Sequence, residues 1–145
     1  GVSASNRLRG IVLHDILSQV SNASDLKKAV DYAQMTGNLT ADEARTAFGL
    51  LTEALKSVED RGWFADDVQL TYNEASLIDT DGEIYRPDRV TVCGGKVVIV
   101  DYKFGEHQNK YEKQVRKYMD MWRRMGYEDV SGFLWYVDAL SVIEV

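Results

Sequence analysis

The sequence predicts a mixed α/β fold in which a β-sheet follows a helical first part. Up to about residue 60, apolar residues recur at the three-to-four-residue spacing of a buried helix face. After Arg61-Gly62 the period changes to two, as in Val68-Leu70-Tyr72. One more amphipathic helix lies between strand-like segments near the end of the chain. Three helices, a strand meander, a helix and further strands are an order typical of a layered α/β sandwich.

The helical part is predicted to contain three helices. They are expected over residues 6–20, 25–35 and 40–59. Apolar residues recur every fourth position in the first of them, and the pair Gly37-Asn38 ends the second. Thr40 and Glu43 match the capping-box pattern, which opens the third.

The remaining chain is predicted to form the sheet and one helix. Extended segments are expected at about 68–78, 83–93 and 96–103, a helix at about 108–125, and one or two strands in the tail around Asp138-Ala139. Asp79-Thr80-Asp81-Gly82 and Gly94-Gly95 supply the turns between the first three strands. These three strands are therefore expected to form an antiparallel meander.

Length and composition fit a single domain with its own core. The 145 residues are 45% hydrophobic and 28% charged, which is ordinary for a globular protein. The one cysteine, Cys93, excludes a disulfide framework within the chain and a four-cysteine metal or iron–sulfur site built from this chain alone. No apolar stretch approaches the ~20 residues of a membrane span. We therefore expect a protein of a reducing, cytoplasmic setting with no membrane partner.

The charge is unevenly distributed along the chain. The formal net charge of −6 argues by itself against a nucleic acid partner. Residues 96–124, however, carry eight basic and four acidic groups, a local charge of +4, which leaves −10 for the remainder. A basic stripe on an acidic body can still meet phosphates while non-specific binding stays weak.

The predicted hairpin around Gly94-Gly95 brings two aspartates together. A two-residue turn sets a register in which Asp88 lies directly opposite Asp101, with Cβ atoms about 5 Å apart. Alternation along the strand puts Asp101 and Lys103 on one face. Residues 97–100 are apolar on both faces, which indicates an interior strand. Two carboxylates and one ammonium are thus expected at the end of a buried strand.

Two opposed carboxylates need compensation, because like charges opposite each other destabilise a sheet and desolvated carboxylates repel strongly. Lys103 supplies part of it. A hard divalent cation does so better, since Mg²⁺ is commonly held by one or two carboxylates, waters and substrate phosphate. Such a cation would activate water and polarise a phosphodiester, with Lys103 orienting the nucleophile or neutralising developing charge. On spacing alone, a plain salt-bridged cluster stays open as the alternative.

The helix predicted at 108–125 has an apolar stripe and a basic flank. Its stripe consists of Tyr111, Val115, Tyr118, Trp122 and Met125. Its basic flank consists of Lys110, Lys113, Lys117 and Arg124, for which a solvated surface is the open alternative. Gln114 lies next to the stripe and is either a boundary residue or an amide that faces the hairpin end.

His14 lies four residues after Gly10 on the first predicted helix. A single histidine on an apolar helix is usually a core or boundary residue. Gly10, which costs helix stability, would let another backbone or a ligand approach that turn. His14 becomes a candidate metal ligand if this helix packs against the strand end.

Four motifs in one order resemble a known family. They are G-x-x-x-H at residues 10–14, P-D at 87–88, V-V-I-V-D-Y-K at 97–103 and Q-x-x-x-Y at 114–118. Together they resemble the RecB-type nucleases of the PD-(D/E)XK superfamily, particularly the nuclease domain at the C-terminus of AddA/RecB-like UvrD/Rep helicases. The resemblance runs from Gly10 to about Tyr136, although residues 21–67 contribute no motif to it. It implies a restriction-endonuclease-like fold, a mixed β-sheet core flanked by helices with an N-terminal helical segment. A single nuclease domain is accordingly expected over residues 5–145, with the helical segment over 6–60 and the sheet core over 68–145.

The resemblance also implies roles for individual residues. The implied catalytic residues are Asp88, Asp101 and Lys103; the implied ligands of Mg²⁺ or Mn²⁺ are His14, Asp88, Asp101 and the Tyr102 backbone carbonyl; the expected DNA contacts are Gln114, Tyr118, Lys110 and Lys117. Glu74 precedes them on a strand where such domains often carry an acidic residue. The second acid is an aspartate instead of the commoner glutamate, and R-P-D-R-V replaces the more typical G-x-x-D-L. No iron–sulfur cluster is expected from a chain with one cysteine.

These implications predict a metal-dependent deoxyribonuclease, an exonuclease acting mostly on single-stranded DNA. The expected partner is a UvrD/Rep-type helicase used in double-strand-break repair or recombination. No G-x-x-x-x-G-K-[ST] motif occurs, so the motor would lie on another part of the polypeptide or another chain. The alternatives are a non-catalytic DNA-binding or docking module with a lapsed nuclease fold, and a structure-specific endonuclease.

Overall fold

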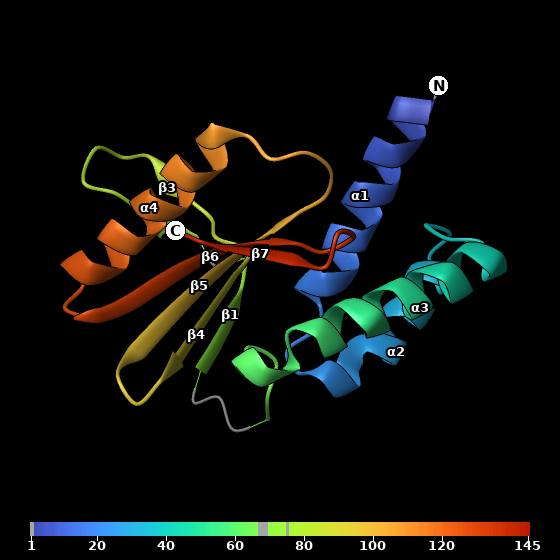
Figure 1. Ribbon diagram of the computed structural model, residues 1–145, viewed down its shortest axis with the longest axis horizontal. Helices are drawn as coiled ribbons and strands as arrows, with labels where there is room; N and C mark the ends of the chain where they lie inside the picture. The colour runs from blue at the N-terminus through green and yellow to red at the C-terminus, as the bar shows by residue number, and fades with distance from the viewer. Residues whose placement is uncertain (1, 67–69, 75) are drawn as a thin grey trace. The chain divides into compact units, whose positions relative to one another are not determined.

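The computed structural model describes residues 2–66, 70–74 and 76–145, with side chains from residue 10 onward except that of Leu70. The predicted strand residue Val68 lies outside the described residues. The chain divides into two compact units, Gly1–Asp66 and Asp67–Val145. The first is helical and the second contains the sheet (Figure 1).

The helical unit contains the three predicted helices. They are α1 (Val2–Ser18), α2 (Leu26–Met35) and α3 (Ala41–Ser57), with short 3-10 turns at Ala23–Asp25 and Glu59–Arg61. The capping box is confirmed, because the Thr40 hydroxyl accepts the Glu43 N–H at 3.2 Å and the Glu43 carboxylate accepts the Thr40 N–H at 2.9 Å. Helix α2 packs between its two neighbours along the chain, and none of the described helices is both long and apolar enough to cross a membrane.

The second unit is built on a mixed five-stranded sheet. Its strands are β1 (Leu70–Asn73), β4 (Arg89–Cys93), β5 (Lys96–Lys103), β6 (Asp129–Tyr136) and β7 (Ser141–Glu144), in the spatial order β1-β4-β5-β6-β7. Among the described strands, only β5 and β6 pair in parallel, and α4 (Asn109–Arg124) provides the crossover between them. The predicted α/β class and the restriction-endonuclease-like sheet are confirmed.

Strand β5 is the central strand of this sheet, as predicted. Val97, Ile99 and Val100 are fully buried, so both faces of the strand are covered. Helix α4 lies along one face of the sheet (Figure 1), and its Val115 and Trp122 join Val97 and Ile99 in the core. The predicted apolar stripe of this helix was wrong at one position: Met125 ends the helix and is 51% exposed.

The predicted first strand, 68–78, was wrong in its extent. Strand β1 ends at Asn73, and Glu74 adopts a left-handed backbone with φ 53° that turns the chain out of the sheet. Strands β2 (Leu77–Ile78) and β3 (Ile84–Tyr85) then form a separate hairpin around the predicted turn 79–82. Asp79 fastens this hairpin to α4, since its carboxylate lies 3.1 Å from the Lys117 ammonium and 3.0 Å from the Arg124 guanidinium.

Candidate active site

The two predicted aspartates meet just beyond the last paired residues of β4 and β5. The ladder ends at Arg89 opposite Val100, which confirms the predicted register and places Asp88 and Asp101 next along each strand. The Asp88 N–H donates to Asp101 Oδ1 at 3.0 Å, and the Tyr102 N–H donates to Asp88 Oδ2 at 2.7 Å. Each carboxylate therefore takes the place of a backbone acceptor, which ties the two strands together where the ladder stops.

Asp101 is the deeply buried member of the pair, at 2% exposure. Burial raises the pKa of its carboxyl from the ordinary 3.8 to about 7, and the Asp88 charge adds to the rise. The Lys103 ammonium and the Asp88 N–H oppose it. Without a further cation, Asp101 therefore holds a proton more readily than an isolated aspartate does.

The Lys103 ammonium is held by three groups on two elements. Its Nζ lies 3.6 Å from Asp101 Oδ2, 3.3 Å from Gln114 Oε1 and 4.3 Å from the centre of the Tyr111 ring. The lysine side chain is 17% exposed, so the ammonium stands at the edge of the buried cluster. A charge in this position can reach a group bound next to Asp101.

Tyr118 lies one turn beyond Gln114 on the same side of α4 and is buried. Burial raises the pKa of its phenol, and the charges of Asp101 and Asp88 raise it further. The hydroxyl therefore stays protonated at neutral pH and can donate a hydrogen bond. The structure thus brings Gln114 and Tyr118 to the end of the hairpin, as the sequence suggested.

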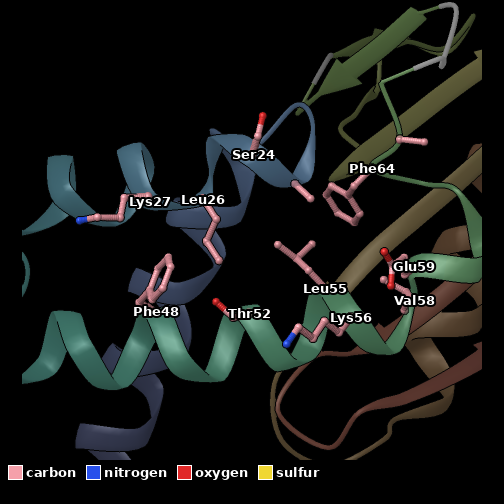
Figure 2. Close-up of a pocket in the computed structure, with 12 residues that line it drawn as sticks. Ser24, Leu26, Lys27, Phe48, Thr52, Leu55, Lys56, Val58, Glu59 and Phe64 are labelled. Carbon is pink, nitrogen blue, oxygen red and sulfur yellow. The ribbon is translucent and has the colours of Figure 1, made fainter.

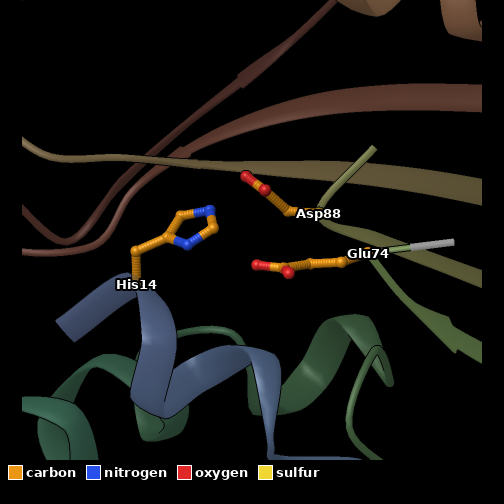
Figure 3. A group of neighbouring side chains, drawn as sticks. All are labelled: His14, Glu74 and Asp88. Atoms are coloured by element: carbon orange, nitrogen blue, oxygen red, sulfur yellow. The ribbon is translucent and has the colours of Figure 1, made fainter. Parts of the chain in front are cut away.

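Glu74 adds a third carboxylate beside Asp88. Its N–H donates to the Asp88 carbonyl at 3.0 Å, and one oxygen of each carboxylate lies within 4.8 Å of the other. Figure 3 shows both side chains extending in the same direction from the ends of their strands. Arg86 partly balances the added charge, with its guanidinium 3.4 Å from Glu74 Oε2.

The donor set fits a hard divalent cation. Carboxylate oxygens are the ligands that Mg²⁺ and Mn²⁺ prefer, and three carboxylates converge here. Burial and, after it, the Asp88 charge raise the pKa of Asp101, and a bound cation would favour the charged carboxylate against both. The Tyr102 N–H points to Asp88, so the Tyr102 carbonyl faces the same edge of β5.

The sequence model of the PD-(D/E)XK nuclease superfamily matches residues 2–143. The chain belongs to that superfamily. Its P-D and D-x-K elements are Pro87-Asp88 and Asp101-Tyr102-Lys103, the residues whose geometry is described above. No curated protein matches the chain. Membership in this superfamily implies a nuclease, a hydrolase of phosphodiesters that generally uses divalent metal ions.

Three further predicted residues of this PD-(D/E)XK domain lie on α1 and α4. His14 is a partly exposed residue of α1 in the helical unit, and its role as a metal ligand stays a prediction. Lys110 is exposed at the start of α4, with its ammonium 5.8 Å from the centre of the Tyr111 ring. Lys117 is engaged by Asp79, so any contact between Lys117 and DNA would compete with that ion pair.

Two residues that the sequence analysis did not assign to the site lie close to it. Arg89 is fully buried and donates to Asn73 Oδ1 at 3.2 Å, which links β4 to β1 beside Asp88. Tyr111 was expected to be a core residue, yet its ring faces the Lys103 ammonium. The position of Arg89 next to the P-D motif was a signal visible in the sequence. The position of Tyr111 depends on how α4 packs against β5, which the sequence alone does not show.

A cavity of about 530 Å³ lies in the helical unit and contains none of the predicted site residues (Figure 2). Its walls are mainly apolar, and lysines stand at its rim; residues that line it include Leu26, Phe48, Leu55, Phe64, Lys27 and Lys56. Glu59 is the one carboxylate among the residues that line the cavity, so the cavity lacks the paired carboxylates that lie at the end of β5. The carboxylates at the end of β5 are the site that fits a nuclease.

Proposed function

We propose that this chain is a Mg²⁺- or Mn²⁺-dependent deoxyribonuclease that degrades single-stranded DNA as the nuclease module of a cytoplasmic helicase–nuclease. The observation that carries the proposal is the arrangement of Asp88, Asp101 and Lys103. The two carboxylates lie within one hydrogen-bond network, and the ammonium stands 3.6 Å from Asp101. The match of the chain to the PD-(D/E)XK nuclease superfamily supports the assignment of these three residues to the catalytic site.

In this proposal Asp88 and Asp101 hold the metal, with the Tyr102 carbonyl and His14 as further ligands. When bound, the metal supplies a polarised phosphate oxygen and a water of lowered pKa. Asp101 gives up its proton at neutral pH to become a ligand. The N–H groups of Asp88 and Tyr102 fix the two carboxylates, so little reorganisation is needed when the substrate arrives.

Lys103 acts on the reacting phosphate. Its ammonium can orient the attacking water or neutralise charge that develops on the phosphate oxygens in the transition state. The DNA strand would lie along the basic start of α4. There the exposed Lys110 would contact a phosphate, and Gln114 and Tyr118 would lie next to the scissile group. The order of the motifs, from G-x-x-x-H to Q-x-x-x-Y, supports a RecB-like enzyme that receives its strand from a UvrD/Rep-type motor.

The test is cleavage of end-labelled linear single-stranded DNA with Mg²⁺ or Mn²⁺. We expect cutting that EDTA and Asp101→Asn both abolish, because each removes the metal from the site. Lys103→Met should lower kcat by about 10²- to 10⁴-fold, the range typical of a positioned acid–base group, while Mn²⁺ still binds. His14→Ala should weaken the Mn²⁺ titration.

Each outcome separates one assignment from another. Full activity of Asp101→Asn would overturn the proposed site. Lost Mn²⁺ binding in Lys103→Met would contradict the role given to the lysine, and an unchanged Mn²⁺ affinity in His14→Ala would return the histidine to a structural role. A wild-type chain that binds DNA without cutting it under any metal would favour the non-catalytic module.

A further inference from the structure

The Lys103 side chain presents a positioning problem that its two polar partners do not solve alone. A lysine has four rotatable side-chain bonds and loses rotamer entropy when its ammonium is held in one place. Asp101 lies on one side of the ammonium at 3.6 Å, and the Gln114 amide lies at 3.3 Å on an exposed residue of α4. A nuclease that depends on this ammonium needs it held at a fixed place.

The Tyr111 ring supplies a further surface for the ammonium. The Nζ atom lies 4.3 Å from the ring centre, well within the ~6 Å at which an ammonium is attracted to an aromatic face. Tyr111 lies one turn before Gln114 on α4, so the ring and the amide approach Lys103 from the same helix. The ring is partly buried against the core, which limits its own movement.

A hydrogen-bonded chain lies directly beside this ring. Tyr136 of β6 lies opposite Lys103 of β5 in the sheet, and its hydroxyl is hydrogen-bonded to Nδ1 of His107. The other ring nitrogen of His107 lies 3.3 Å from Glu112 Oε1, and Glu112 follows Tyr111 on α4. His107 therefore bridges the sheet to the first turn of α4, with its ring centre 6.5 Å from that of Tyr111.

We propose that Tyr111 is a positioning residue, whose ring holds the Lys103 ammonium beside Asp101 and is itself held by the Tyr136–His107–Glu112 chain. This inference rests on the proposed nuclease function of the same site. Tyr111 needs only its aromatic face for this role, so its hydroxyl is dispensable. The ring acts through Lys103 and contributes to turnover instead of to binding of the DNA strand.

The experiment compares kcat and KM of the 145-residue chain on single-stranded DNA with Mg²⁺. Tyr111→Phe keeps the aromatic face and should retain kcat within about twofold. Tyr111→Leu should lower kcat on the order of tenfold, with KM changed by less than about twofold, because a misplaced ammonium affects the transition state more than the bound substrate. Tyr136→Phe, which breaks the chain at one hydroxyl, should lower kcat in the same direction.

Tyr127→Leu is the matched control, since Tyr127 is also a partly buried tyrosine packed against the core cluster. Tyr127→Leu should lower the stability of the protein and leave kcat unchanged. If Tyr111→Leu does not fold by circular dichroism, Tyr111→Met provides the same comparison with a flexible apolar side chain. Tyr111→Leu with unchanged kcat, or with a raised KM alone, would overturn the inference while the nuclease stands. A wild-type chain without metal-dependent cleavage would overturn the proposed function and this inference together.

Discussion

Two negative charges and one positive charge meet at the end of β5, and the Asp101 side chain, at 3% exposure, is buried more deeply than Lys103 at 17%. Burial disfavours the charged form of a carboxyl, and the neighbouring Asp88 adds repulsion, so the pKa of Asp101 rises to about 7. In the unfolded chain the same group has an ordinary pKa near 3.8. The difference makes the metal-free protein sensitive to pH near neutrality.

The direction of this sensitivity follows from proton binding. Between about pH 4 and pH 7 the folded state binds the Asp101 proton more than the unfolded state does, so this group's contribution to the free energy of unfolding falls as the pH rises. The contribution is present in full below the pKa that Asp101 has in the unfolded state. It is lost as the pH rises through the pKa that Asp101 has in the folded state. We expect denaturant titrations in EDTA to show lower stability at about pH 8 than at about pH 5.5.

Asp101→Asn is the control for this pH dependence. It removes the titrating group and should flatten the change between the two pH values. If the free energy of unfolding changes with pH equally in the wild type and in the variant, another group causes the pH dependence. Mg²⁺ should act in the opposite direction, stabilising the wild type more at high pH, because it binds the deprotonated carboxylate.

Among the elements, the sequence was most informative where a local pattern determines the geometry. The Gly94-Gly95 turn predicted the register of β4 and β5, and the Thr40–Glu43 capping box predicted the start of α3; both are confirmed. The sequence was least informative between residues 68 and 87. There the hairpin depends on Asp79, whose partners on α4 lie 38 and 45 residues further along the chain. Contacts of such separation leave no periodic signal.

The packing of α4 on β6 gives a prediction at the same scale. Gly132 lies on β6 under the helix, and a Cβ atom there would meet Met119 Sδ at 2.5 Å and Val115 Cγ1 at 2.6 Å. Gly132→Ala should therefore push the helix from the sheet and destabilise the protein by about 1–3 kcal/mol, the usual cost of overpacking. A urea titration would measure it.

Gly49→Ala is the matched control in α3. A Cβ atom at Gly49 would have no heavy-atom neighbour within 4 Å, so the substitution should stabilise the helix by about 0.5–1 kcal/mol. Equal stability changes for the two alanine variants would contradict the close packing of α4 against β6. The glycine in β6 is thus assigned to packing, with no part in the chemistry of the site.

Over the whole molecule, the basic character of residues 96–124 is smaller than the formal charge of +4 suggests. Among the described residues, the pairs of Lys103 with Asp101, Arg116 with Glu112 and Arg123 with Asp120 join groups that the +4 already counts. Lys117 and Arg124 pair instead with Asp79. Asp79 lies outside this segment and is buried to 7% side-chain exposure, so it neutralises part of the basic flank internally. Electrostatic attraction to DNA should therefore come from few groups and be weak, in line with the net charge of −6.

Lys110 and Lys117 should respond differently when their charges are removed. Lys110→Gln should weaken binding of a labelled single strand and reduce the slope of log affinity against log salt by about 0.7, the value for one lost phosphate contact. Lys117→Gln should leave that slope nearly unchanged and instead lower the thermal midpoint, because Asp79 would keep its burial and lose a partner at 3.1 Å. Fluorescence anisotropy in EDTA between about 50 and 200 mM salt measures the first effect, and thermal unfolding measures the second. A reduced slope in Lys117→Gln with unchanged stability would show that the DNA strand displaces Asp79 from this lysine, and the basic flank would then be a larger binding surface than the ion pairs indicate.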